Sequence, residues 1–268
     1  MKFGVNTFVT DETIRPTVLG RALEERGFDS LWLAEHSHIP ASRETPYPGG
    51  GELPPPYYRA LDPFVVLPAV AAVTENLLLA TGITLLIQRD TIHTAKSVAS
   101  LDHISGGRVL FGVGVGWNRE EMRNHGTDPR TRGALMDEQL DAMIELWTRD
   151  KAEFHGKFVD FDPSFAWPKP VRKPHPPIYV GGNSPAAVAR ANRYGGWLPM
   201  GFSDPAKVAG VVAQVRPGVA ITVGSIPQSA ELIAACAEAG VERVTFYLPH
   251  VPEDDGLRQL DKFAELIS

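Results

Sequence analysis

The chain has 268 residues, of which 43% are hydrophobic, and it carries a formal net charge of −6. This size suits one α/β barrel with a large core, while the negative charge and the lack of a Lys/Arg run argue against nucleic acid or a membrane surface as the main partner. A single cysteine, Cys236, excludes a disulfide framework, and no apolar run approaches the roughly 18 residues of a membrane span. Because no charged segment followed by an apolar one opens the sequence, we do not expect a secretory leader. We therefore expect a cytoplasmic enzyme that acts on a small molecule, with a homodimer left open.

Short apolar runs alternate with longer helical patterns eight times along the chain. The runs predict buried strands at 2–9, 28–34, 77–86, 108–116, 176–182, 196–200, 218–226 and 242–248. Helical patterns follow them at 12–26, 62–75, 91–104, 131–149, 185–194, 204–214, 228–239 and 255–267. Eight strand–helix units predict an α/β fold, a single parallel (β/α)₈ TIM barrel over residues 1–268.

Two connections are longer than a barrel requires. Residues 39–61, rich in Pro and Gly, follow the second strand, and loops after strands lie on the catalytic face of a barrel. We expect this loop to be a lid. Residues 150–176 follow a helix and form an insertion before the fifth strand, where we expect a hairpin whose face is left open.

Two histidines end the second strand, in FDSLWLAEHSHIP at 28–40. Because residues two apart share one face of a strand, His36 and His38 can both point into the barrel mouth. They could bind a metal, serve a cofactor, or cap a packed core. A metal needs further ligands at other strand ends, and those ends are rich in glycine and apolar residues, so no metal site is predicted. An imidazole that exchanges protons beside a cofactor fits better.

The fourth strand is rich in glycine, in GGRVLFGVGVGWNREEM at 106–122. It lacks a dinucleotide fingerprint, because Trp117 and Arg119 occupy the positions where that motif needs glycine. The glycines at 112, 114 and 116 share one face, which predicts either room for a flat ligand or tight packing inside the barrel. Four arginines follow, and they form either a basic patch or a solvated helix face: Arg119, Arg123, Arg130 and Arg132.

The fifth strand runs into a helix start, in IYVGGNSPAAV at 178–188. Asn183 or Ser184 can cap the helix, and Pro185 suits its first position. Backbone N–H groups at such a turn favour an anion such as a phosphate. The same residues also suit an ordinary capped helix start that binds no anion.

Longer motifs resemble a known family. TAKSVASLDHISGGRVLFGVGVGW, FDSLWLAEHSH and KPHPPIYVGGNSP are similar to the bacterial luciferase-like flavin and deazaflavin oxidoreductases, over nearly the whole chain. SRETPYPGGGELP and VGWNREEM resemble an actinobacterial subgroup of probable F420-dependent oxidoreductases. The resemblance implies a barrel that binds coenzyme F420, or less often FMN, at its C-terminal mouth, with hydride transfer at the ring.

The resemblance also implies roles for individual residues. His36 matches the histidine beside the deazaflavin and would exchange the substrate proton. Gly82 and Ile83 match a non-prolyl cis peptide that bulges against the ring. The other expected cofactor contacts are Glu35, Gly114, Gly116, Trp117 and Asn118, with Gly181, Gly182 and Asn183 at the phosphate, while His38 and Tyr57 are expected at the substrate or lid.

Two departures bear on the substrate. Sugar-phosphate dehydrogenases of this superfamily place an acid near Trp117 and a tryptophan at the position of Pro40, so glucose 6-phosphate is not expected. The resemblance implies F420-dependent hydride transfer to or from an unidentified small organic substrate. The alternatives are an FMN-dependent monooxygenase and a flavin-binding protein without turnover.

Overall fold

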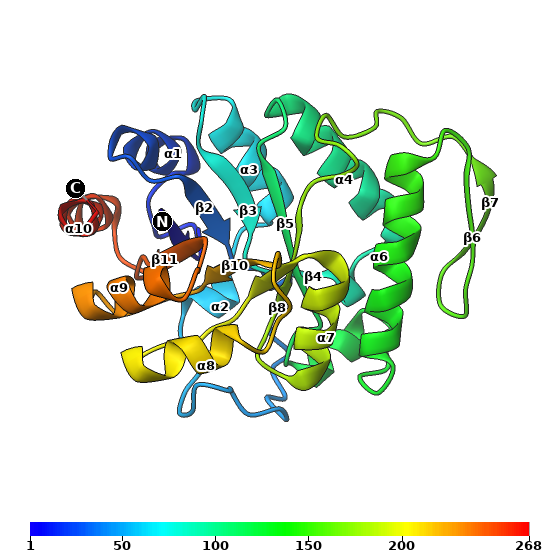
Figure 1. The fold of residues 1–268 in the computed structure, drawn as a ribbon. Helices are drawn as coiled ribbons and strands as arrows, with labels where there is room; N and C mark the ends of the chain where they lie inside the picture. The colour runs from blue at the N-terminus through cyan, green and yellow to red at the C-terminus, as the bar shows by residue number, and fades with distance from the viewer. Residues whose placement is uncertain (268) are drawn as a thin grey trace.

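The computed structural model describes residues 1–267, and its centre is a closed barrel of parallel strands (Figure 1). Its strands are β1 (Lys2–Thr7), β2 (Ser30–Leu33), β3 (Leu78–Thr81) with its continuation β4 (Thr84–Leu85), β5 (Val109–Gly114), β8 (Ile178–Gly181), β9 (Gly196–Leu198), β10 (Ala220–Val223) and β11 (Arg243–Tyr247). Neighbouring strands pair in parallel, and β1 pairs with β11 to close the circle. The predicted (β/α)₈ barrel is confirmed.

Helices surround the barrel on all sides (Figure 1). They are α1 (Pro16–Glu25), α3 (Pro63–Ala71), α4 (Thr91–Ile104), α6 (Arg132–Thr148), α7 (Pro185–Tyr194), α8 (Val208–Val212), α9 (Ala230–Glu238) and α10 (Glu253–Glu265). Short helices not foreseen are α2 (Pro56–Arg59), α5 (Arg119–Asn124), η1 (Leu86–Gln88) and η2 (Pro205–Lys207). Within residues 1–267, no helix combines the length and the hydropathy that crossing a membrane requires.

Side chains fill the inside of the barrel. One buried cluster joins Trp32, Leu110 and Tyr179 from different strands, and a larger cluster lies between the strands and the helices. Gly112 belongs to this packing, because a Cβ there would lie 2.0 Å from the carbonyl oxygen of Thr81. For Gly112, the tight-packing interpretation is therefore correct, and the ligand interpretation is wrong.

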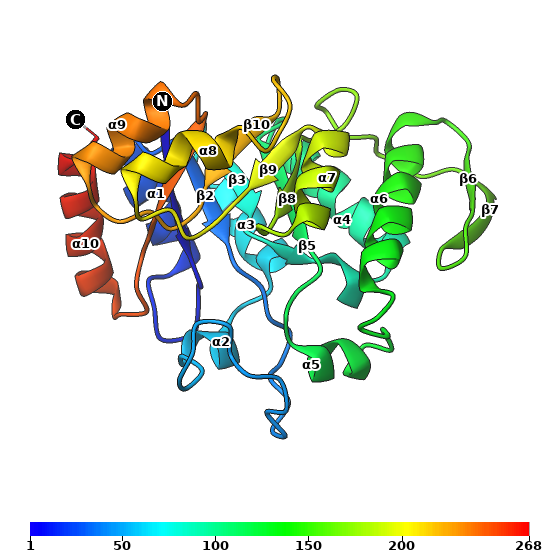
Figure 2. The ribbon, with the colours of Figure 1, turned by 60° about the horizontal axis from the view of Figure 1, so that its bottom comes forward.

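The two long connections lie at different places. Residues 150–176 contain the antiparallel hairpin of β6 (Ala152–His155) and β7 (Asp160–Ser164), which stands off beside α6 (Figure 1). The predicted hairpin is thus present. The 39–61 loop carries α2 and lies at the end of the barrel where α5 also lies (Figure 2).

Candidate functional site

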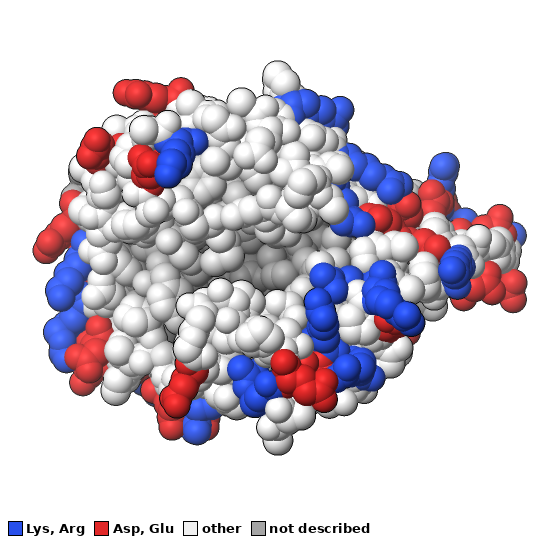
Figure 3. Space-filling view, turned by 90° about the horizontal axis from the view of Figure 1, so that it is seen from below, with Lys and Arg blue, Asp and Glu red and all other residues white. Residues whose placement is uncertain are grey.

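A cavity of about 990 Å³ opens at the C-terminal ends of the barrel strands. Figure 3 looks into this hollow, whose rim is mostly uncharged while Lys and Arg side chains gather along one side. Many predicted site residues line it: Glu35, His36, Tyr57, Gly82, Ile83, Gly114, Gly116, Trp117, Gly181, Gly182 and Asn183. The topology therefore brings the ends of β2, β3, β5 and β8 to one cavity.

Ile83 forms part of the cavity wall. The peptide bond between Gly82 and Ile83 is cis, as the resemblance implied, and it separates β3 from β4 within the predicted strand 77–86. A Cβ at Gly114 would lie 2.1 Å from Cδ1 of Ile83, and one at Gly181 would lie 2.8 Å from its Cγ2. These two glycines thus make room for the Ile83 side chain, which presents an apolar surface to the cavity.

His36 is held by a buried carboxylate. Its Nδ1 lies 2.8 Å from Oε2 of Glu121, which is fully buried, and the other carboxylate oxygen accepts the N–H of Ser37 at 3.1 Å. Burial by itself raises the pKa of Glu121, but the bonds from His36 and Ser37 outweigh burial and hold that pKa below its ordinary value. With Nδ1 engaged, Nε2 is the ring nitrogen left to meet a molecule in the cavity.

Aromatic rings surround the His36 imidazole. Its centroid lies 5.2 Å from that of Tyr57, 5.8 Å from Trp117 and 6.5 Å from Phe8. Tyr47 of the 39–61 loop also lines the cavity, and its hydroxyl accepts the hydroxyl of Tyr57 at 3.3 Å. The loop predicted to be a lid therefore supplies part of the wall.

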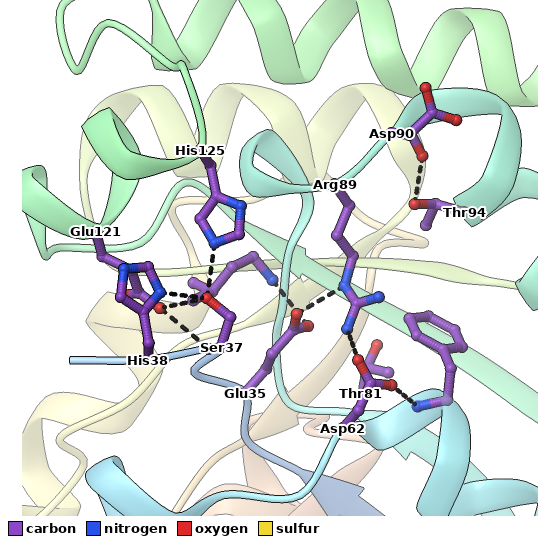
Figure 4. Close-up of polar contacts among 12 residues, drawn as sticks. Glu35, Ser37, His38, Asp62, Thr81, Arg89, Asp90, Thr94, Glu121 and His125 are labelled. Carbon is purple, nitrogen blue, oxygen red and sulfur yellow. Dashed lines mark hydrogen bonds and ion pairs between the residues drawn. The ribbon is translucent and has the colours of Figure 1, made fainter. Parts of the chain in front are cut away.

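Glu35 lines the cavity, but the protein itself already binds its carboxylate. Nε of Arg89 donates to Oε1 at 2.6 Å and the N–H of Leu85 to Oε2 at 3.2 Å, while Arg89 also pairs with Asp62 (Figure 4). Burial raises the pKa of Glu35 to about 7, although the Arg89 cation opposes that rise. Glu35 thus anchors Arg89 and the start of η1 at the edge of the cavity.

His38 does not line the cavity. Nδ1 of His38 lies 2.9 Å from the hydroxyl of Ser37, and the same hydroxyl lies 2.7 Å from Nε2 of His125 (Figure 4). Nε2 of His38 lies 2.8 Å from the amide nitrogen of Asn124. Within residues 1–267, no group of three or more His, Cys, Asp and Glu side chains is arranged to hold a metal ion. His36 therefore lines the cavity, whereas His38 lies outside it among polar side chains.

Two consecutive acids of α5 tie this helix to both sides of the site. Asn118, predicted as a ring contact, instead caps α5 behind the wall and accepts the N–H of Glu121 at 3.3 Å. Glu120 accepts the N–H of Thr45 at 2.8 Å and also its hydroxyl, so it fixes the 39–61 loop. Glu121 fixes His36. The six-residue helix thereby sets the distance between the loop and the imidazole.

The GGNSP turn begins α7 at the far side of the cavity. Ser184 caps the helix through the N–H of Ala187, as predicted. The N–H of Gly182 donates to the carbonyl of Leu198 at 3.2 Å, so it is not free for a phosphate. The Asn183 side chain bonds both backbone groups of Met200.

Arg190 supplies a cation at this end of the cavity. It lies six residues beyond Ser184 and lines the wall, and Asp137 of α6 holds its guanidinium at 2.6 and 2.8 Å. Four arginines were predicted to form either a basic patch or a solvated helix face, and they lie outside the wall: Arg119, Arg123, Arg130 and Arg132. Arg123 pairs with Glu44 and Arg130 with Asp128.

Sequence reasoning missed Glu121, Arg190 and Tyr47. Glu121 lies within the quoted VGWNREEM motif, but nothing in the sequence links it to His36. Arg190 had a usable signal, because it lies less than two helical turns from the predicted anion turn.

The chain resembles known proteins. The luciferase-like monooxygenase family model matches residues 1–234. Uncharacterized protein Rv0953c of Mycobacterium tuberculosis is 38% identical over 279 residues, covering 98% of each chain. The FMNH2-dependent dimethylsulfone monooxygenase of Pseudomonas putida is 37% identical over 126 residues, which are 45% of this chain and 33% of that one. An F420-dependent secondary alcohol dehydrogenase, solved with an F420–acetone adduct, shares the fold with a TM-score of 0.76 at 17% identity, covering 99% of this chain and 97% of that one.

Proposed function

Because the chain belongs to the luciferase-like monooxygenase family, we propose that it is an oxidoreductase that uses F420 and transfers hydride between this cofactor and a small organic substrate. The observation that carries the proposal is the His36–Glu121 pair at the wall of a large cavity, beside the apolar surface of Ile83. A positioned imidazole serves a reaction that moves a proton together with a hydride.

The cavity residues fit a deazaflavin. Ile83 offers a flat ring an apolar support, and its side chain already fills the space above Gly114 and Gly181. Arg190 and the start of α7 offer positive charge to the phosphate and the acidic tail of F420. When bound, F420 supplies a ring position that accepts or releases hydride. Gly116 and Trp117 would lie beside that ring.

We assign the transfer of the substrate proton to His36. Its Nε2 would take a proton from a substrate oxygen during oxidation or return one during reduction. The Glu121 carboxylate would stabilise the imidazolium form and keep the ring orientation constant through both steps. The surrounding aromatic rings would exclude water from the reacting atoms.

Two alternatives remain distinct from this proposal. An FMN-dependent monooxygenase is favoured by the similarity to the Pseudomonas putida enzyme, although that similarity covers less than half of this chain. A flavin-binding protein without turnover needs the cavity but not the His36–Glu121 pair. We favour F420 because the proton group is built into the wall and because the VGWNREEM and SRETPYPGGGELP motifs resemble the F420 subgroup.

Side-by-side titrations of the purified chain with F420 and FMN test the cofactor. We expect F420 to bind at least about tenfold more tightly, because its acidic tail adds charge that Arg190 can meet. Tight FMN binding with no measurable F420 binding would reject the proposal in favour of the monooxygenase. If F420 binds but no substrate ever exchanges hydride with it, the protein is a carrier.

A further inference from the structure

The part of the cavity around His36 is walled by aromatic side chains from four separate elements. Phe8 follows β1, Tyr57 lies on α2, Trp117 follows β5 and Tyr247 ends β11. Phe8 and Tyr57 have centroids 4.7 Å apart, and Tyr57 and Trp117 have centroids 6.3 Å apart. From this wall we propose that the substrate is an uncharged, flat apolar molecule that bears a hydroxyl or carbonyl oxygen. The inference rests on the proposed function.

Little charge faces this compartment. Among residues 1–267, the wall contains Glu35 and Arg190 as charged side chains besides the histidine. Arg89 and a backbone N–H bind the Glu35 carboxylate, and Arg190 lies on α7 with Asp137 as its partner. A carboxylate or phosphate placed against the aromatic rings would therefore lose its hydration without gaining a cation.

The phenols of Tyr57 and Tyr247 stay neutral as well. Burial raises the pKa of Tyr57, and burial followed by the neighbouring Tyr47 raises that of Tyr247. The guanidinium of Arg43 lies 5.9 Å from the Trp117 centroid, but Arg43 does not line the cavity. The compartment thus offers ring faces for stacking and His36 for a polar contact.

The oxygen of the substrate follows from His36. In the oxidation of an alcohol, the carbinol C–H bond would break and its electron pair would pass with the hydrogen to F420. The hydroxyl proton passes to Nε2 of His36 as the C=O bond forms. Reduction of the carbonyl compound reverses both transfers, so atoms and electrons balance without a further reactant.

Matched probes test the substrate class. Acetophenone and 1-phenylethanol are uncharged, 4-acetylbenzoate adds one negative charge to the same ring, and glucose 6-phosphate represents a charged sugar. We expect calorimetric titration of the full chain, with and without saturating F420, to show the uncharged pair binding at least about tenfold more tightly than either anion. Equal or tighter binding of 4-acetylbenzoate would overturn the inference, and so would a failure of both uncharged probes to bind while F420 binds.

Two tyrosines of the same helix provide the matched variants. Tyr57 lines the cavity, whereas its neighbour Tyr58 is 53% exposed and does not. Tyr57→Leu is expected to weaken acetophenone binding about tenfold, while Tyr58→Leu leaves it unchanged. Tyr247→Leu, at a partly exposed strand end, is a second variant that should weaken binding even if Tyr57→Leu unfolds. Equal affinities in all three variants would overturn the inference.

The same titrations separate this inference from the proposed function. If acetophenone binds with the expected preference and responds to Tyr247→Leu while F420 does not bind, the substrate class stands and the cofactor proposal fails. If F420 binds tightly but charge on the probe makes no difference, the cofactor proposal stands and the substrate class is wrong.

Discussion

Nδ1 of His36 lies 2.8 Å from a carboxylate oxygen of Glu121, a fully buried residue 85 positions later in the chain. The two residues come from strands that flank β3 in the barrel, since His36 follows β2 and Glu121 lies on the short helix after β5. A buried carboxylate is costly unless it is bonded, so the pair determines both the orientation of the imidazole and the ionisation of Glu121.

Glu121→Gln tests this pair through stability. In the folded protein the pKa of Glu121 lies below its ordinary value of 4.5. The stabilisation that ionised Glu121 gives to the fold is therefore complete above about pH 4.5, and it is lost as pH falls through the lower pKa of the folded state. On acidification from about pH 5 to about pH 3, the free energy of unfolding should therefore fall more steeply for the wild type than for Glu121→Gln. Urea denaturation at a series of pH values measures both slopes. Parallel slopes would show that ionised Glu121 does not stabilise the fold.

Glu35→Gln should behave in the opposite way. Burial raises the pKa of Glu35 from 4.5 to about 7, so the folded state binds more protons than the unfolded state between these values. The contribution of Glu35 is complete below about pH 4.5 and is lost as pH rises through about 7. The stability of the wild type relative to Glu35→Gln should therefore decrease across this range. A constant difference would mean that Arg89 keeps Glu35 ionised throughout.

Arg190→Gln tests the anion end of the cavity. The variant should bind F420 about tenfold more weakly and with a shallower dependence on salt, because one cation facing the phosphate or the acidic tail is lost. Arg193→Gln is the matched control, since Arg193 lies on the same helix and pairs with Asp141 but does not line the cavity. If the two variants lose affinity equally, the phosphate lies elsewhere.

Much of the fold follows from local patterns. Buried strands separated by helical patterns define the barrel, and the positions of Gly and Pro mark its turns, so every barrel strand falls within a predicted run. Strand patterning does not predict the break between β3 and β4, because Gly82 and Ile83 lie in a continuous run of apolar and β-branched residues. The short helices α2 and α5 could not be predicted from a helical pattern, because each is less than two turns long.

The site was predictable only where one segment carries the chemistry. His36 and the glycine turns could be placed at strand ends from the sequence, and the structure puts them at one cavity. The partners of these residues depend on how distant segments meet. Glu120 and Glu121 look alike in the sequence, yet one holds Thr45 and the other holds His36. Likewise, Gly112 and Gly114 share a face, but Thr81 covers the first and Ile83 the second.

His36→Ala, compared with His38→Ala, tests the central claim most directly. The measurement is the rate of hydride exchange between F420 and the tightest-binding uncharged probe, together with F420 affinity. We expect His36→Ala to lower the rate roughly 100-fold or more while F420 affinity stays nearly intact, because a general acid–base group contributes on that scale. His38→Ala should have a much smaller effect, since His38 lies outside the cavity. An undiminished rate in His36→Ala would contradict the proposed role of the His36–Glu121 pair.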